Sequence, residues 1–253
     1  MTNSYNATAE AVLKKEQDIR GEIANGEPVP VLDRLDLVGE ILDLAVNYLT
    51  IHDASQPVQN LKNEKARKLV YRAVTCMEEI VSKIIDAPFT DYEEQLAAIE
   101  ELSCAQRYDL AQKMDIALQS LKNAFENNAK WKWALVETEG RLAAVVKNMI
   151  DLRNVIADTD PYSPNYEPAV FHVRLAKKLL MQAADSYRKK YELCTNHTDD
   201  FKMGIVFLSA LKRLNTFTGD QSEAVEVKKQ LDTWTRKLVT DINKQAQSRY
   251  TKG

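Results

Sequence analysis

The sequence predicts an all-α protein, an elongated antiparallel bundle of about eight or nine helices, and three observations support this prediction. The prolines stand at only seven positions, and long stretches without proline, such as residues 89–160, permit long helices. Apolar residues recur every three or four positions, which is the period of one helix face. Only seven glycines are present, and the alternating pattern and turn dipeptides of β-hairpins are hard to find.

The first part of the chain, residues 1–88, is expected to form an N-terminal subdomain of helical hairpins. A helix is expected over about residues 4–24, although its apolar stripe is thin. Residues 32–49 carry a broad apolar stripe, wide enough to be covered from two sides, which predicts a central helix. Residues 61–86 predict another helix, and the short connection between the two favours an antiparallel pair.

The second part, residues 89–253, is expected to form a bundle of longer helices, either separate from the first part or continuous with it. Thr90 with Glu93 has the spacing of a capping box, and Ser103 is a second expected N-terminal cap. Residues 130–158 carry apolar side chains at helix-packing intervals over roughly three heptads. We therefore expect one uninterrupted helix there.

The segment DTDPYSPNYEP, residues 158–168, is the clearest loop of the sequence and the predicted hinge. Helices are predicted after it at residues 167–194, 198–216 and 221–247. Successive helix pairs suggest solenoid-like stacking of hairpins, although the tetratricopeptide pattern of Trp, Leu-Gly, Tyr, Ala and Pro does not recur. The prediction is therefore hairpin stacking without a sequence repeat.

The charge balance argues against nucleic acid as the main partner. The formal net charge is −3, whereas affinity for nucleic acid comes largely from neutralising phosphates. Basic residues do gather in two late segments, residues 174–190 and 228–252. A nucleic-acid-associated protein that uses these late basic helices is therefore one alternative, weighed against a solvated helix surface.

The cysteines and the N-terminus indicate the compartment. Cys76, Cys104 and Cys194 are an odd number in different helical stretches, which favours free or buried thiols in a reducing environment. The N-terminus is polar, and no apolar stretch reaches about 18 residues. We expect a cytoplasmic protein with no membrane contact, or alternatively an exported form that has lost its leader.

One candidate metal site follows the predicted helix of residues 167–194. Cys194, His197 and Asp199 combine soft and hard ligands of the kind that zinc accepts. No second Cys/His pair exists in the sequence, so a closed site would need a distant partner such as His172. We interpret this clustering as incidental rather than as a metal site.

A second candidate metal site lies in the predicted loop, where Asp158, Asp160 and Glu167 offer oxygen ligands suited to calcium. The spacing departs from that of an EF-hand, so turn formation and charge at the start of the next helix are the preferred interpretation. A di-iron bundle needs Glu-x-x-His twice, and that signature is absent. We predict no catalytic residue and no cofactor; a metal-binding or carboxylate-metal helical enzyme is the competing class.

The strongest candidates for partner binding are two closely spaced tryptophans. Trp131 and Trp133 lie about 200° apart on a helix, so both cannot face one core. Two alternatives follow for the second indole. It is exposed as an anchor for a partner, because Trp is enriched at interface hot spots, or a neighbouring segment of the protein covers it. Tyr162 and Tyr166 of the loop are expected near the same contact. The predicted function is a non-enzymatic scaffold or adaptor that binds a protein partner or self-associates, with a homodimer as one form.

Overall fold

The computed structural model describes residues 2–51, 55–126 and 128–250. Long helices make up most of these residues: α1 (Thr2–Ala24), α2 (Val31–Thr50), α3 (Gln56–Ile80), α5 (Cys104–Ala124), α6 (Ala129–Asn148), α8 (Tyr166–Lys190), α9 (Thr198–Phe217) and α10 (Gln221–Tyr250). Shorter turns of helix are η1 (Phe89–Tyr92), α4 (Glu93–Ala97), α7 (Val155–Asp158) and the π-helical η2 (Tyr191–Thr195). No strand occurs in the described ranges, which confirms the all-α prediction.

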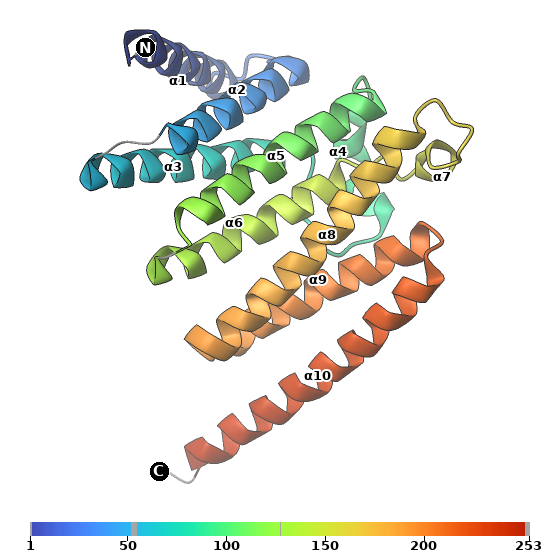
Figure 1. Ribbon diagram of the computed structural model, residues 1–253. Helices are drawn as coiled ribbons and strands as arrows, with labels where there is room; N and C mark the ends of the chain where they lie inside the picture. Colours follow the sequence, from blue (N-terminus) through green and yellow to red (C-terminus); the bar gives the residue numbers. More distant parts are fainter. Residues whose placement is uncertain (1, 52–54, 127, 251–253) are drawn as a thin grey trace.

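The long helices form hairpins that stack on one another (Figure 1). The successive pairs are α2 with α3, α5 with α6, and α8 with α9. Between pairs, α5 contacts both α2 and α3, and α8 contacts both α5 and α6. The first helix of each hairpin thus packs on both helices of the hairpin before it. This is how helix pairs stack in α-solenoids.

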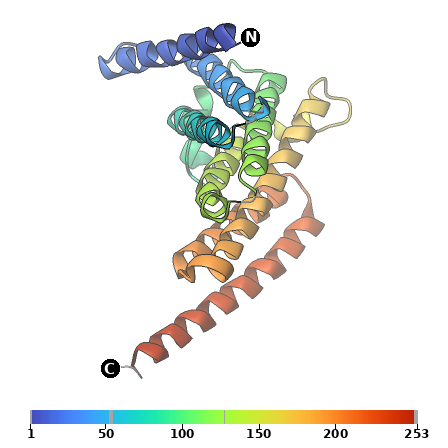
Figure 2. The ribbon, with the colours of Figure 1, turned by 60° about the vertical axis from the view of Figure 1, so that its left-hand side comes forward.

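The first and last helices close the two ends of the stack. Helix α1 packs principally against α2, and α10 packs principally against α9. Both views place α1 and α10 at opposite ends of an elongated molecule, with the two termini far apart (Figures 1 and 2).

One cluster of buried apolar side chains extends through the stack, from Ala9 in α1 to Leu238 in α10. It includes residues on both sides of position 88, where the sequence suggests a boundary. Independent folding of residues 1–88 and 89–253 stays a prediction.

Two glycines allow neighbouring helices to approach closely. A Cβ atom on Gly140 of α6 would lie 2.9 Å from ring atoms of both Tyr187 and Phe207. A Cβ atom on Gly204 of α9 would lie 3.0 Å from the backbone oxygen of Ala184 in α8. The contacts of α6 and α8 with α9 therefore depend on these positions having no side chain.

The two predicted N-terminal caps differ. Ser103 caps α5: its Oγ accepts a hydrogen bond from the backbone N of Gln106 at 3.2 Å, and the Gln106 Oε1 accepts one from the backbone N of Ser103 at 2.9 Å. The prediction for Thr90 is wrong. Thr90 lies inside η1, and its hydroxyl is 3.3 Å from the carboxylate of Asp91.

The helix predicted over residues 130–158 is interrupted, because α6 ends at Asn148. The Asn148 side chain is 1% exposed, and its Nδ2 donates to the backbone oxygen of Ser82 at 2.8 Å. Three residues on, the Asp151 carboxylate accepts from the backbone N of Arg153 at 3.1 Å, a local bond that competes with helix formation. The segment between α6 and α7 is thus held by backbone turn hydrogen bonds together with these side-chain contacts.

Candidate functional site

The predicted partner-binding residues fall into two groups at opposite ends of α6. Trp131 and Trp133 lie in its first turns, whereas Tyr162 and Tyr166 lie beyond its C-terminal end, in the following loop and at the start of α8. Helix α6 has 20 residues and therefore spans roughly 30 Å. The structure does not bring the two groups together.

Trp131 is half-buried by side chains of the protein itself. Its ring centroid lies 5.7 Å from that of Phe125. The guanidinium carbon of Arg67, from α3, lies 4.4 Å from the Trp131 ring centroid, a cation–π distance. Trp131 therefore serves the packing of α3 against the start of α6.

Trp133 lines a pocket of about 380 Å³ where the end of α5, the start of α6 and the end of α8 meet. We call it the Trp133 pocket; its walls include Phe125, Leu135, Val136, Lys132 and Lys189. The indole is half-buried, and the Lys132 ammonium lies 5.4 Å from its ring centroid. The two tryptophans thus have different surroundings, as their angular separation on the helix requires.

The loop residues mainly hold the loop together. The Asp158 carboxylate accepts a hydrogen bond from the Asn165 side-chain amide at 3.0 Å, and the Asp160 carboxylate accepts one from the backbone N of Tyr162 at 2.9 Å. The Tyr162 side chain is 97% exposed, whereas Tyr166 is half-buried. These contacts agree with the interpretation of the acidic residues as turn formers.

The structure gathers neither of the candidate metal-ligand sets. Cys194, His197 and Asp199 are all exposed, and the Asp199 carboxylate pairs with Lys202 at 2.8 Å. Glu167 is exposed on the first turn of α8. In the described part of the chain, no three His, Cys, Asp or Glu side chains are grouped so that they could hold a metal ion.

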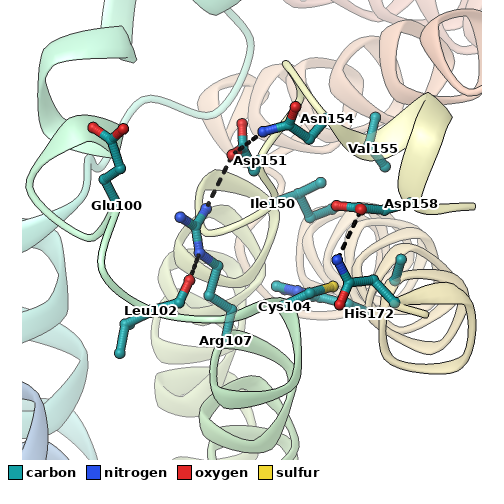
Figure 3. Close-up of a pocket in the computed structure, with 12 residues that line it drawn as sticks. Glu100, Leu102, Cys104, Arg107, Ile150, Asp151, Asn154, Val155, Asp158 and His172 are labelled. Carbon is teal, nitrogen blue, oxygen red and sulfur yellow. Dashed lines mark hydrogen bonds and ion pairs between the residues drawn. The ribbon is translucent and has the colours of Figure 1, made fainter. Parts of the chain in front are cut away.

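A second pocket, which we call the polar pocket, lies at the opposite end of α6 from Trp133. Figure 3 shows the residues that line it. It has a volume of about 290 Å³ and is formed by the turn before α5, the start of α5, the segment after α6, and the start of α8. Its polar lining includes Glu100, Cys104, Arg107, Asp151, Asp158 and His172. They come from three separate parts of the sequence, residues 100–107, 151–158 and 172, which meet through the packing of α5, α6 and α8.

Arg107 is 4% exposed and binds backbone oxygens. Its guanidinium donates to the backbone oxygens of Leu102 at 3.1 Å, Ile99 at 3.0 Å and Met149 at 3.5 Å. Burial lowers the pKa of Arg107, against the effect of the nearby Asp151, whose carboxylate lies 4.0 Å away. Arg107 therefore joins the turn before α5 to the end of α6.

The pocket carboxylates differ in their partners. Burial alone would raise the pKa of Asp151, but hydrogen bonds from Arg153 and Asn154 hold it below its ordinary value. Asp158 has the amide of Asn165 as its hydrogen-bond partner, and neither Asp158 nor Glu100 forms an ion pair with any described residue.

His172 is 3% exposed, and its Nε2 lies 2.9 Å from the backbone oxygen of Val146. Burial lowers the pKa of His172 to about 4, so the ring is neutral at pH 7. A carbonyl oxygen can only accept, hence Nε2 carries the proton and Nδ1 is a bare acceptor. Burial, with a further contribution from Asp158, raises the pKa of the Cys104 thiol, which keeps it protonated.

Within the described ranges, no helix is long and apolar enough to cross a membrane. No curated protein and no solved structure shows significant similarity to the chain. The family model of the TP0443 family matches residues 1–242, almost the whole sequence. The chain therefore belongs to the TP0443 family.

Proposed function

We propose that the protein is a non-enzymatic helical scaffold or adaptor that binds a protein partner at the Trp133 pocket. The observation that carries this proposal is that the Trp133 indole lines an open pocket while remaining half-buried. Trp offers a large contact area at a low entropic cost, and interface hot spots are enriched in it. A half-buried indole is also held in place before a partner arrives, which lowers the cost of binding.

The charges around the pocket favour a partner segment with an acidic group beside an apolar side chain. Lys132 and Lys189 are exposed at the rim, and neither forms an ion pair with a described residue. Lys122 contributes less, because its ammonium lies 2.9 Å from the buried carboxylate of Glu139. Glu126 is the remaining carboxylate of the rim, so the free charge there is positive.

The architecture supports the same role by analogy with other helical repeats. Stacked hairpins present extended surfaces that solenoid proteins use to bind partners. Here the stack runs from α1 to α10 in one elongated body (Figure 2).

The test is to isolate the tagged full-length protein from its native source, identify the protein that co-purifies stoichiometrically, and measure its affinity for variants. Trp133→Ala is expected to weaken binding at least tenfold with little change in thermal stability, because Trp133 is only half-buried. Lys189→Glu is expected to weaken it by reversing a rim charge.

The matched control is Lys83→Glu, a charge reversal at an exposed lysine beside Ser82, near the C-terminal end of α6. It should leave affinity unchanged. Full affinity in folded Trp133→Ala and Lys189→Glu proteins would remove the Trp133 pocket as the contact. A solitary protein that carries stoichiometric metal would favour the metal-enzyme class instead.

A further inference from the structure

We infer that a third pocket, between α1, α2 and α3, binds an aliphatic carboxylate, an anionic group on a short apolar chain. We call it the arginine pocket; it has a volume of about 220 Å³, and three arginines contribute to its lining, Arg20, Arg34 and Arg72. Its helices form the α1 end of the stack (Figures 1 and 2). The site is separate from the Trp133 pocket, and the inference does not depend on the scaffold proposal.

The arginine pocket carries an excess of positive charge. Besides the three arginines, its charged lining consists of Glu16 and Glu79. Glu16 is 2% exposed, and its Oε1 accepts from Nε of Arg20 at 2.9 Å and from Nε of Arg72 at 2.8 Å. Its Oε2 accepts from Nη2 of Arg72. One buried carboxylate is thus shared by two guanidinium groups, and the pocket attracts an anion.

Arg34, near the start of α2, is the guanidinium that is left for a ligand. Its Nη2 lies 3.2 Å from the carboxylate of Glu79, whose side chain is 59% exposed, whereas the Arg34 side chain is 16% exposed. Its Nε is buried and has no hydrogen-bond partner among the described residues. Buried polar atoms in native proteins almost always have partners, so this unpaired donor on a side chain of the pocket wall indicates a ligand that accepts.

The neighbouring thiol does not supply the missing negative charge. Burial raises the pKa of Cys76, against the effect of Arg34, and keeps the thiol protonated. Glu79 is therefore the anionic partner of Arg34 in the pocket wall, and ion pairs with so exposed a carboxylate contribute little to stability. A ligand carboxylate can replace Glu79 at a small cost.

The apolar part of the lining selects an organic anion. Ile19, Leu37 and Ile41 are buried, and Ile23 is 44% exposed beside them. An aliphatic chain would remove Ile23 from water, which an inorganic anion cannot do. The planar guanidinium of Arg binds a carboxylate through two parallel hydrogen bonds. The small volume favours a short chain, as found in short-chain fatty acids and at the C-terminus of a protein that ends in an apolar residue.

The experiment titrates the full-length protein with hexanoate at low ionic strength and pH 7.5, by isothermal calorimetry. We expect saturable binding of one molecule per chain. The neutral analogue 1-hexanol and inorganic phosphate are each expected to bind about tenfold more weakly or less, because the first lacks the charge and the second lacks the apolar chain.

Two variants and one control locate the site. Arg34→Gln should weaken hexanoate binding about tenfold, whereas Glu79→Gln, at an exposed position, should strengthen it severalfold because it removes the competing carboxylate. Arg236→Gln makes the same change at an exposed arginine of α10, outside the pocket, and should leave affinity unchanged. Circular dichroism confirms that each variant is folded; where Arg34→Gln does not fold, Arg34→Lys replaces it, with weaker binding again expected because the planar fork is lost.

A parallel titration with N-acetylleucine, which carries the carboxylate of a peptide C-terminus beside an apolar side chain, distinguishes the two sources of the ligand. Tighter binding of N-acetylleucine than of hexanoate would assign the site to the C-terminus of another protein, and the reverse order would assign it to a free short-chain acid. Absence of binding by both carboxylates would overturn the inference. So would equal affinities of hexanoate and 1-hexanol, or of hexanoate for wild-type protein and the folded Arg34 variant.

Discussion

At the scale of single residues, two polar side chains buried around the end of α6 bind backbone oxygens and also line a pocket. His172 and Arg107 each donate to backbone oxygens while lining the same pocket. Their hydrogen bonds reach backbone oxygens at the early end of α6, those of Val146 and Met149, and in the turn before α5, those of Ile99 and Leu102. Both side chains are thus buried with backbone oxygens as partners.

The neutral state of His172 predicts a pH dependence of stability. Its pKa is lowered from 6.5 to about 4 by burial, so below pH 6.5 the unfolded chain takes up a proton that the folded chain does not. The free energy of unfolding should therefore fall as the pH decreases from 6.5 to 4, by up to about 3 kcal/mol from this group. Urea denaturation at several pH values measures this decrease in the free energy of unfolding.

The control for this prediction is His172→Gln, whose amide can still donate to the backbone oxygen of Val146. This variant is expected to be less stable at pH 7 but to lose less stability between pH 6.5 and 4. Parallel losses in the two proteins would show that other groups cause the pH dependence.

At the scale of helices, close packing depends on small residues. Gly204→Ala would place a Cβ 3.0 Å from the backbone oxygen of Ala184, which cannot move without shifting α8. We expect the free energy of unfolding to fall by about 1–3 kcal/mol. Urea denaturation of the purified variant measures this change.

Gly21→Ala in α1 is the matched control, because nothing lies within 4 Å of the added Cβ. The same substitution should raise the free energy of unfolding by about 0.5–1 kcal/mol through helix propensity alone. Equal effects of the two substitutions would contradict the close approach of α9 to α8.

At the scale of the whole molecule, the stack is expected to be most stable at its centre. Helices α5, α6 and α8 have packed helices on several sides, whereas α1 and α10 pack principally on one neighbour each. Local opening should therefore require less free energy at the ends. Hydrogen–deuterium exchange followed by mass spectrometry should show faster exchange in α1 and α10 than in α5, α6 and α8; uniform protection along the chain would contradict this gradient.

The sequence by itself determined the fold class, most of the helices and the different surroundings of the two tryptophans. Each of these depends on local periodicity or on one nearby residue. The apolar stripes specify amphipathic helices, Ser103 specifies the start of α5, and two positions about 200° apart on a helix cannot share one environment.

Only the tertiary structure decided where α6 ends and how the polar pocket is formed. The apolar period continues past Asn148, but α6 ends there, where the Asn148 side chain bonds to the backbone oxygen of Ser82 and the Asp151 carboxylate accepts from the backbone N of Arg153. Likewise, no spacing in the sequence connects Arg107 of α5 with His172 of α8. The two residues meet because α5 packs against α8, and contacts of that kind depend on the three-dimensional fit of several helices, which a linear pattern does not contain.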